Sequence, residues 1–184
     1  MIYDFIAQFA KLSGVAHRVV SLPAAAGKIA ELCRARKAGC VALAGLPSAL
    51  VAELASLCPE ITLLNEPYDR AALPMAIDRA DVGVTGIAFA IAQSGTMVEV
   101  ADNDATRLVS SLPRVHIGVV REKDIIDQYF ASAGRIRECF ARHGSNLVLS
   151  FISGPSRTGD IELKLTLGVH GPEEVHCLII AAAP

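Results

Sequence analysis

Short apolar runs alternate with helical segments along most of this sequence, and this alternation constrains the fold more than any other feature. Parallel strands need crossover connections and lose water on both faces, so they appear as short, nearly continuous apolar runs. The pattern therefore predicts a doubly wound α/β fold, in which helices cover both faces of a mostly parallel sheet. One domain is expected to span residues 1–184.

The individual elements follow from apolar periodicity and from the turn residues between them. Strands are expected at 17–22, 40–44, 61–64, 81–85, 96–101, 115–120, 147–152 and 175–181. Helices are expected at 2–12, 23–37, 49–57, 69–79, 87–93, 104–111 and 122–143. Residues 1–13 form the N-terminal helical segment, whose apolar stripe suits it to cover an edge or a partner.

The expected topology also predicts where a ligand would bind. In open parallel sheets, ligands bind beyond the carboxyl ends of the strands. The turns after Ala44, Thr85, Val120 and Ser153 are therefore the expected positions of a functional site.

Composition and charge exclude several classes of protein. Hydrophobic residues make up 52% of the chain and the net charge is −2, so a globular core is expected and a nucleic-acid partner is not. The first residues include acidic Asp4 where a signal peptide has basic residues, and the apolar runs are too short to span a bilayer. A cytoplasmic location without a membrane span is the expectation.

The five cysteines show no pattern typical of a metal or iron–sulfur site. They are scattered through the chain, without a C-x-x-C pair or a cluster-binding run. We interpret them as reduced cysteines that behave as small hydrophobic residues. They are Cys33, Cys40, Cys58, Cys139 and Cys177.

The densest polar segment, SGPSRTGDIE at 153–162, directly follows an expected strand. Gly154 would let the backbone approach a ligand, and Arg157 could bind a carboxylate or phosphate through two parallel hydrogen bonds. Further binding residues are expected at Ser156, Thr158, Asp160 and Glu162, the last as a partner that orients Arg157. The alternative is an ordinary surface loop with its own salt bridge.

Two histidines near the C-terminus have different expected roles. His170 lies between glycines in GVHGP at 168–172 and is the candidate catalytic residue for proton transfer. His176 falls inside an expected strand, where a core or edge histidine is the better interpretation. The two histidines lack the spacing of a metal site.

Two further segments could contribute to the same crevice. Thr85 ends one expected strand and Ser94, Gly95 and Thr96 open the next, although the glycine spacing is not that of a dinucleotide-binding loop. Arg107 follows Asp104, the expected helix cap, and could either contact an anion or point into solvent.

Several of these segments resemble successive motifs of one family. DVGVTG at 81–86, QSGT at 93–96, ATRLVSSLP at 105–113 and His116-Ile117 resemble motifs of the LUD (lactate utilisation) family. The segments at 153–162 and 168–172, with His176 beyond, are similar to its closing signature of GPSRTADIE and GVHGP. The resemblance covers roughly residues 81–180.

The resemblance implies a fold of the ribose-5-phosphate isomerase and CoA-transferase type and a role in oxidising lactate to pyruvate. It implies that the chain carries no cofactor and acts as an accessory or small-anion-binding subunit. Iron–sulfur clusters would reside on two partner subunits, one cysteine-rich and one ferredoxin-like. Gln93 departs from the acidic residue of many relatives, which puts an acid–base role there in doubt.

Two other functions remain open at this point. Arg157 and His170 on such a fold would also suit a free-standing enzyme that acts on a phosphorylated or CoA-linked metabolite. A non-catalytic ligand-sensing module is the third alternative. In every case, we expect the loops around Arg157 and His170 to lie side by side at the carboxyl edge of the sheet.

Overall fold

A computed structural model describes residues 2–144, 146–158 and 166–181. Its helices are α1 (Phe5–Lys11), α2 (Leu22–Ala35), α3 (Ser48–Leu57), α4 (Met75–Asp78), α5 (Asp104–Ser111) and α6 (Ser132–His143). Its first strands are β1 (Val15–Val19), β2 (Cys40–Ala44), β3 (Thr62–Leu64), β4 (Val82–Gly86), β5 (Phe89–Ile91) and β6 (Thr96–Ala101). The others are β7 (Val115–Arg121), β8 (Ile125–Ile126), β9 (Val148–Ile152), β10 (Arg157–Thr158), β11 (Thr166–Leu167) and β12 (Glu174–Ile180).

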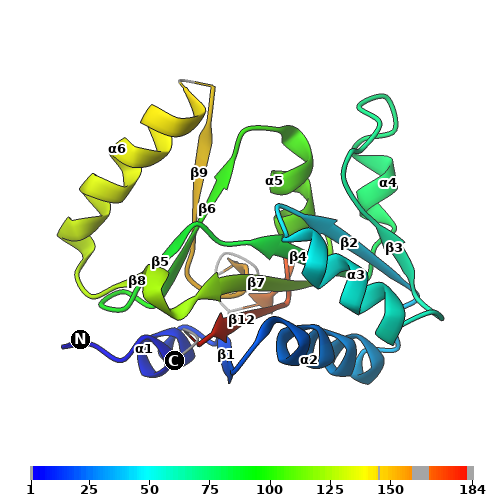
Figure 1. Ribbon diagram of the computed structural model, residues 1–184, viewed down its shortest axis with the longest axis horizontal. Helices are drawn as coiled ribbons and strands as arrows, with labels where there is room; N and C mark the ends of the chain where they lie inside the picture. The colour runs from blue at the N-terminus through cyan, green and yellow to red at the C-terminus, as the bar shows by residue number, and fades with distance from the viewer. Residues whose placement is uncertain (1, 145, 159–165, 182–184) are drawn as a thin grey trace.

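The principal sheet has six strands in the order β1-β12-β7-β4-β2-β3, and every neighbouring pair is parallel (Figure 1). Side chains alternate between its faces. On β2, Val41 and Leu43 pack beneath α2 and α3, whereas Ala42 and Ala44 pack against α4 and α5. Helices thus cover both faces of a parallel sheet, which confirms the predicted fold class.

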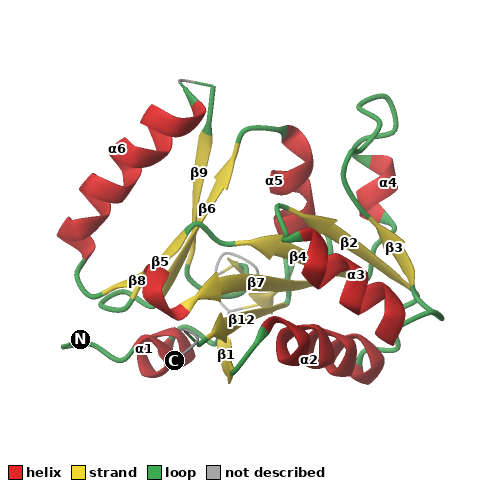
Figure 2. Cartoon of the chain, viewed as in Figure 1, coloured by secondary structure: helices red, strands yellow, loops and turns green. Residues whose placement is uncertain are grey.

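The sequence did not reveal that the strands separate into two sheets. A second sheet, in the order β8-β5-β6-β9, extends away from the principal sheet, and α6 lies alongside it (Figure 2). Its β5–β6 and β6–β9 pairs are antiparallel. This second sheet and α1 lie over β7 and β12 on the face that also holds α5.

Three expected helices were wrong in whole or in part. The run at 87–93 contains strand β5 (Phe89–Ile91) instead, because this apolar run has no polar face and all of Phe89–Ile91 is buried. The expected helix at 122–143 begins only at Ser132, after two 3₁₀ turns and β8. The one expected at 69–79 is reduced to Met75–Asp78, because Pro74 stands at the helix start and not in its interior.

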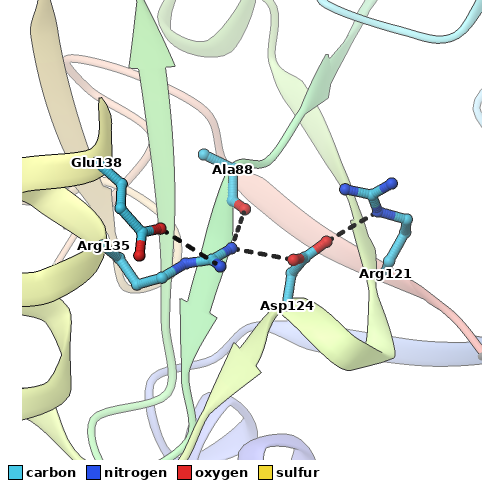
Figure 3. Close-up of polar contacts among 5 residues, drawn as sticks. All are labelled: Ala88, Arg121, Asp124, Arg135 and Glu138. Atoms are coloured by element: carbon cyan, nitrogen blue, oxygen red, sulfur yellow. Dashed lines mark hydrogen bonds and ion pairs between the residues drawn. The ribbon is translucent and has the colours of Figure 1, made fainter. Parts of the chain in front are cut away.

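The buried carboxylate of Asp124 links the second sheet and α6 to the principal sheet (Figure 3). Asp124 Oδ2 accepts a hydrogen bond from Arg121 Nε at 2.8 Å, and its Oδ1 accepts one from Arg135 Nη2 at 2.9 Å. Arg135 also lies over the Phe89 ring, with its Cζ 5.8 Å from the ring centroid. These contacts join the ends of β7, β5 and α6.

Replacing Asp124 by asparagine is expected to lower the free energy of unfolding by about 1–3 kcal/mol, because two charge-assisted hydrogen bonds lose their anion. Urea denaturation measures the change. The matched control is Glu138→Gln, since Glu138 approaches Arg135 only to 3.8 Å and its side chain is 61% exposed. The control should change stability by less than about 0.5 kcal/mol, and equal effects of the two variants would contradict the assigned role of Asp124.

Candidate functional site

A hollow of about 700 Å³ lies between α5, β9 and the turn at 168–172, and we call it the α5–β9 pocket. Most of the residues that border it come from these three segments. Its polar border includes Arg107, Ser110, His116, Ser156 and His170. The pocket therefore brings together four candidate residues from three motifs, namely Arg107, Gly154, Ser156 and His170.

The loops around Arg157 and His170 lie side by side in their described parts, as expected. The Ser156 N–H donates to the Pro172 carbonyl at 3.0 Å, and the Gly168 N–H donates to the Ser156 carbonyl at 3.0 Å. Their expected position at the carboxyl edge was wrong. The 168–172 turn precedes β12 and His116 is the second residue of β7, so the pocket lies at the amino edge of the principal sheet.

Arg70, Arg107 and His170 are exposed residues at the border of the pocket, and the two arginines supply its positive charge. Asn103, and not Asp104 as expected, caps α5 by accepting a hydrogen bond from the Thr106 N–H at 3.0 Å. The helix buries Ala105 and Val109, which leaves Arg107 half-exposed with only a loose contact of 3.7 Å to Asp104. A guanidinium held so weakly is available to an anionic ligand.

Four buried polar residues form the floor beneath the pocket. Thr85 Oγ1 lies 2.9 Å from His116 Nε2, and the Ser110 hydroxyl donates to Glu99 Oε1 at 3.0 Å. Burial lowers the pKa of His116 to about 3, so its imidazole is neutral. Burial also raises the pKa of Glu99, although hydrogen bonds from Thr85 and Ser110 oppose that rise.

The raised pKa of Glu99 predicts a pH-dependent stability. A carboxyl group whose pKa is higher in the folded than in the unfolded state lowers the free energy of unfolding as pH rises from about 4.5 through the folded pKa. Glu99→Gln cannot ionise, so its stability relative to wild type should improve between about pH 4.5 and pH 8. Urea denaturation at both pH values checks this, with exposed Glu53→Gln as control. If the stability difference between Glu99→Gln and wild type is the same at both pH values, the pKa of Glu99 is not raised in the folded protein.

Several other candidate residues lie along the contact with α1. The hydroxyls of Ser94, Thr96 and Ser153 form a chain, with Oγ–Oγ1 distances of 2.8 Å and 2.9 Å to Thr96. Gly95 and Gly154 both have positive φ. A Cβ on Gly95 would lie 2.5 Å from the Phe9 nitrogen, and one on Gly154 would lie 2.3 Å from the Leu12 carbonyl oxygen. This packing accounts for both glycines.

Arg157 also contacts the segment that follows α1. Its Nη2 donates to Ser13 Oγ at 3.0 Å, and Arg157 does not border the α5–β9 pocket. Thr158 is half-buried in β10. Asp160 and Glu162 lie outside the described residues. Arg107 is therefore better placed than Arg157 to bind an anion in this pocket.

A separate hollow of about 540 Å³ lies at the carboxyl edge of the principal sheet. It is bordered by the turns after Ala44 and Thr85 and by the end of β7, which are three of the four expected positions. Gly45 and Gly86 approach closely there, since a Cβ on Gly86 would lie 2.1 Å from the Gly45 carbonyl oxygen. Its border is mainly apolar and includes Arg121.

Two further predicted positions have structural partners. His176 is a nearly buried histidine of β12, as expected, and its Nδ1 lies 3.3 Å from His17 Nε2. The Gln93 side-chain oxygen accepts a hydrogen bond from the Tyr129 N–H at 2.9 Å. Gln93 therefore connects β5 to the turn before α6.

Sequence reasoning singled out Thr85 but missed the other three residues of the floor, which are Glu99, Ser110 and His116. Glu99 gave a readable signal, because it is the only charged residue in the apolar strand at 96–101. The sequence contains no comparable signal for the pairing of Thr85 with His116. It depends on the β4–β7 register, in which His116 lies opposite Gly83.

The model of the LUD domain family matches residues 2–180. The chain belongs to this family. Among curated LUD relatives, lactate utilization protein C of Shouchella clausii is 33% identical over 122 residues, 66% of this chain and 52% of that protein. The Bacillus subtilis protein of the same name is 33% identical over 106 residues, 56% of this chain and 44% of that protein. The chain thus spans about half the length of the curated relatives it matches.

A solved structure supports the LUD assignment. The crystal structure of a DUF162 family protein from Deinococcus radiodurans has a TM-score of 0.59 and 26% sequence identity, and the match covers 96% of each chain. Within the described ranges of our LUD chain, no three His, Cys, Asp or Glu side chains gather as a metal site would require. Nor does any helix among the described residues have the length and hydrophobicity needed to cross a bilayer.

Proposed function

We propose that this chain provides a small-carboxylate-binding site to a lactate-utilisation system and works beside iron–sulfur subunits that carry the electrons. The observation that supports this most is the α5–β9 pocket, where Arg107, Ser156 and His170 from three motifs border one hollow. An arginine with polar neighbours recognises a carboxylate well. The names of the curated relatives point to the same metabolism.

The cysteines favour partner subunits as the carriers of iron–sulfur clusters. Iron binds the thiolate, and burial raises the pKa of all five thiols, that of Cys33 to about 12. We therefore assign the clusters to a cysteine-rich and a ferredoxin-like subunit in the cytoplasm. The present chain would bind or position the organic acid as an accessory subunit.

Anaerobic reconstitution with those two iron–sulfur subunits tests the proposal. Lactate-dependent reduction of the clusters should fall by about tenfold or more when this chain is omitted. The same rate without the chain would contradict an accessory role, and turnover of lactate by the isolated chain would contradict the division of labour.

The hollow at the carboxyl edge supports a second candidate function. Parallel sheets bind ligands at this edge, and Arg121 is a cation at its border. A free-standing enzyme that acts on a phosphorylated or CoA-linked metabolite would use such a position. Turnover of a metabolite of either kind by the isolated chain would favour this function over the first.

A further inference from the structure

Two buried polar atoms in the floor of the α5–β9 pocket have no hydrogen-bond partner. They are His116 Nδ1 and Glu99 Oε2, and no group among the described residues bonds to either. Both residues are completely buried. Buried polar atoms without a partner are uncommon in folded proteins, so two of them beneath one pocket call for an explanation.

Thr85 connects these two side chains. Its Oγ1 lies 2.9 Å from His116 Nε2, and its hydroxyl lowers the pKa of Glu99 through a hydrogen bond to the carboxylate. A hydroxyl has one proton to donate, and an ionised carboxylate can only accept. When Glu99 is ionised, Thr85 therefore donates to Glu99 and accepts from His116 Nε2–H. Because a neutral imidazole carries one proton, Nδ1 is then an acceptor without a donor.

This acceptor nitrogen belongs to a residue that faces the α5–β9 pocket. The neighbouring β7 residues Val115 and Ile117 pack beneath α2 and α3, so His116 points to the opposite face of the sheet. His116 borders the pocket, and so does Val175, which lies opposite it on β12. Since Thr85 occupies Nε2, Nδ1 is the nitrogen left for an O–H or N–H group of a ligand.

Ser110 holds the Glu99 carboxyl group in either charge state. Its hydroxyl donates to Glu99 Oε1 at 3.0 Å and has a second acceptor in the Arg107 carbonyl oxygen at 3.1 Å. If Glu99 carries a proton, Ser110 can turn to that carbonyl and accept from Glu99 instead. Uptake of a proton by Glu99 therefore leaves no new buried group unpaired at this oxygen.

The ionisation of the two residues suits proton transfer through His116 and not storage on it. Burial lowers the pKa of His116 to about 3, with a smaller contribution from the charge of His176, so the imidazole does not keep a second proton. Burial raises the pKa of Glu99, which makes this carboxylate the better proton acceptor. The other charged or titratable residues that border the pocket are Arg70, Asp104, Arg107 and His170.

We infer that His116, Thr85 and Glu99 form a proton relay that accepts a proton from an O–H or N–H group of a ligand in the α5–β9 pocket. The inference rests on the proposed function only for the identity of the ligand. It adds the route by which that ligand loses a proton, and it makes this chain the general base of the system.

Each step of the relay breaks one bond to hydrogen and forms another. The bond between the ligand atom and its proton breaks, the electron pair stays on the ligand, and an N–H bond forms at His116 Nδ1. The Nε2 proton passes to the Thr85 oxygen, and the Thr85 proton passes to Glu99. His116 remains neutral, Glu99 becomes a carboxylic acid, and every hydrogen bond of the chain reverses its direction.

The tautomer of His116 tests the relay in the isolated chain without a ligand. The ¹⁵N shifts of the imidazole distinguish the Nε2–H from the Nδ1–H tautomer, and the ¹³C shift of the Glu99 carboxyl group reports its ionisation. We expect Nε2–H to be the major tautomer while Glu99 is ionised. The Nδ1–H tautomer should become the major one as Glu99 takes up its proton at lower pH.

Three variants show whether Thr85 carries this coupling. Thr85→Val removes the hydroxyl and Glu99→Gln cannot ionise, so the tautomer ratio of each should be the same throughout the titration. Thr85→Ser keeps the hydroxyl and should keep the change. Thr62→Val, at an exposed position of β3, is the matched control and should behave as wild type does.

The role as base is measured with the iron–sulfur subunits present. Glu99→Gln should lower the rate of lactate-dependent cluster reduction by about 100-fold while the affinity for L-lactate in calorimetry stays the same. Exposed Glu53→Gln is the control and should keep the wild-type rate. An unchanged rate in Glu99→Gln would overturn the role as base.

The failures of the relay and of the proposed function are distinguishable. A His116 tautomer that stays constant while Glu99 titrates would overturn the relay, as would a change that persists in Thr85→Val. A Glu99 carboxyl group that keeps one ionisation state between about pH 5 and pH 9 would also overturn it, because it could not accept a proton. These results leave small-carboxylate binding untouched, whereas failure to bind L-lactate or pyruvate would contradict the proposed function alone.

Discussion

Replacing Gly83 by alanine is expected to destabilise the protein by about 3 kcal/mol or more. Gly83 lies in β4 where α5 packs directly on the strand, and an added Cβ would be 1.9 Å from the Val109 carbonyl oxygen. Because that oxygen belongs to the helix backbone, α5 itself would have to move. Ser110 follows Val109, so the floor of the pocket would be displaced as well.

Gly27→Ala in α2 is the matched control for this effect. A Cβ on Gly27 meets nothing within 4 Å, and alanine is the better helix former, so this variant should gain about 0.5–1 kcal/mol. Urea denaturation of both variants gives the comparison. A Gly83→Ala protein that unfolds at the wild-type urea concentration would show that α5 does not pack on β4 in this way.

Replacing Arg107 by glutamine is expected to weaken the binding of L-lactate or pyruvate by about 10–100-fold, the loss of one charge-assisted interaction with the carboxylate. The fold should be unaffected, because Arg107 is half-exposed and only loosely paired. Calorimetry measures the affinity, and circular dichroism checks the fold. Arg137→Gln, at an exposed position of α6, is the control and should bind as wild type does.

Arg157 is the competing candidate from the sequence motif. Arg157→Lys keeps the charge and loses the fork of the guanidinium, so it should weaken binding only if Arg157 contacts the ligand. Its hydrogen bond to Ser13 leads us to expect unchanged affinity. Weak binding by Arg157→Lys together with normal binding by Arg107→Gln would show that the anion binds at Arg157 in β10 and not at Arg107.

Local sequence patterns were sufficient for most of the principal sheet. Strands such as 40–44 and 115–120 are bounded by turn residues and buried on both faces, so their apolar runs are clear. The run at 87–93 has the same composition, but its length suits a helix or a strand equally. Only its pairing with β6 and β8 decides between them.

The site was predictable to the extent that it depends on single loops. The polar residues around Ser156 and His170 follow or precede clear strands, so their position next to a sheet was readable from the sequence. The sequence did not show at which edge of the principal sheet the pocket lies, because β9 belongs to the second sheet and runs antiparallel to β6. The floor joins residues from four elements through packing, which no local pattern records.

A crystal structure of the chain with L-lactate or pyruvate tests the central claim most directly. It should show the carboxylate within hydrogen-bonding distance of Arg107 in the α5–β9 pocket. An acid bound instead at the carboxyl edge, beside Gly45 and Gly86, with the α5–β9 pocket empty, would contradict it.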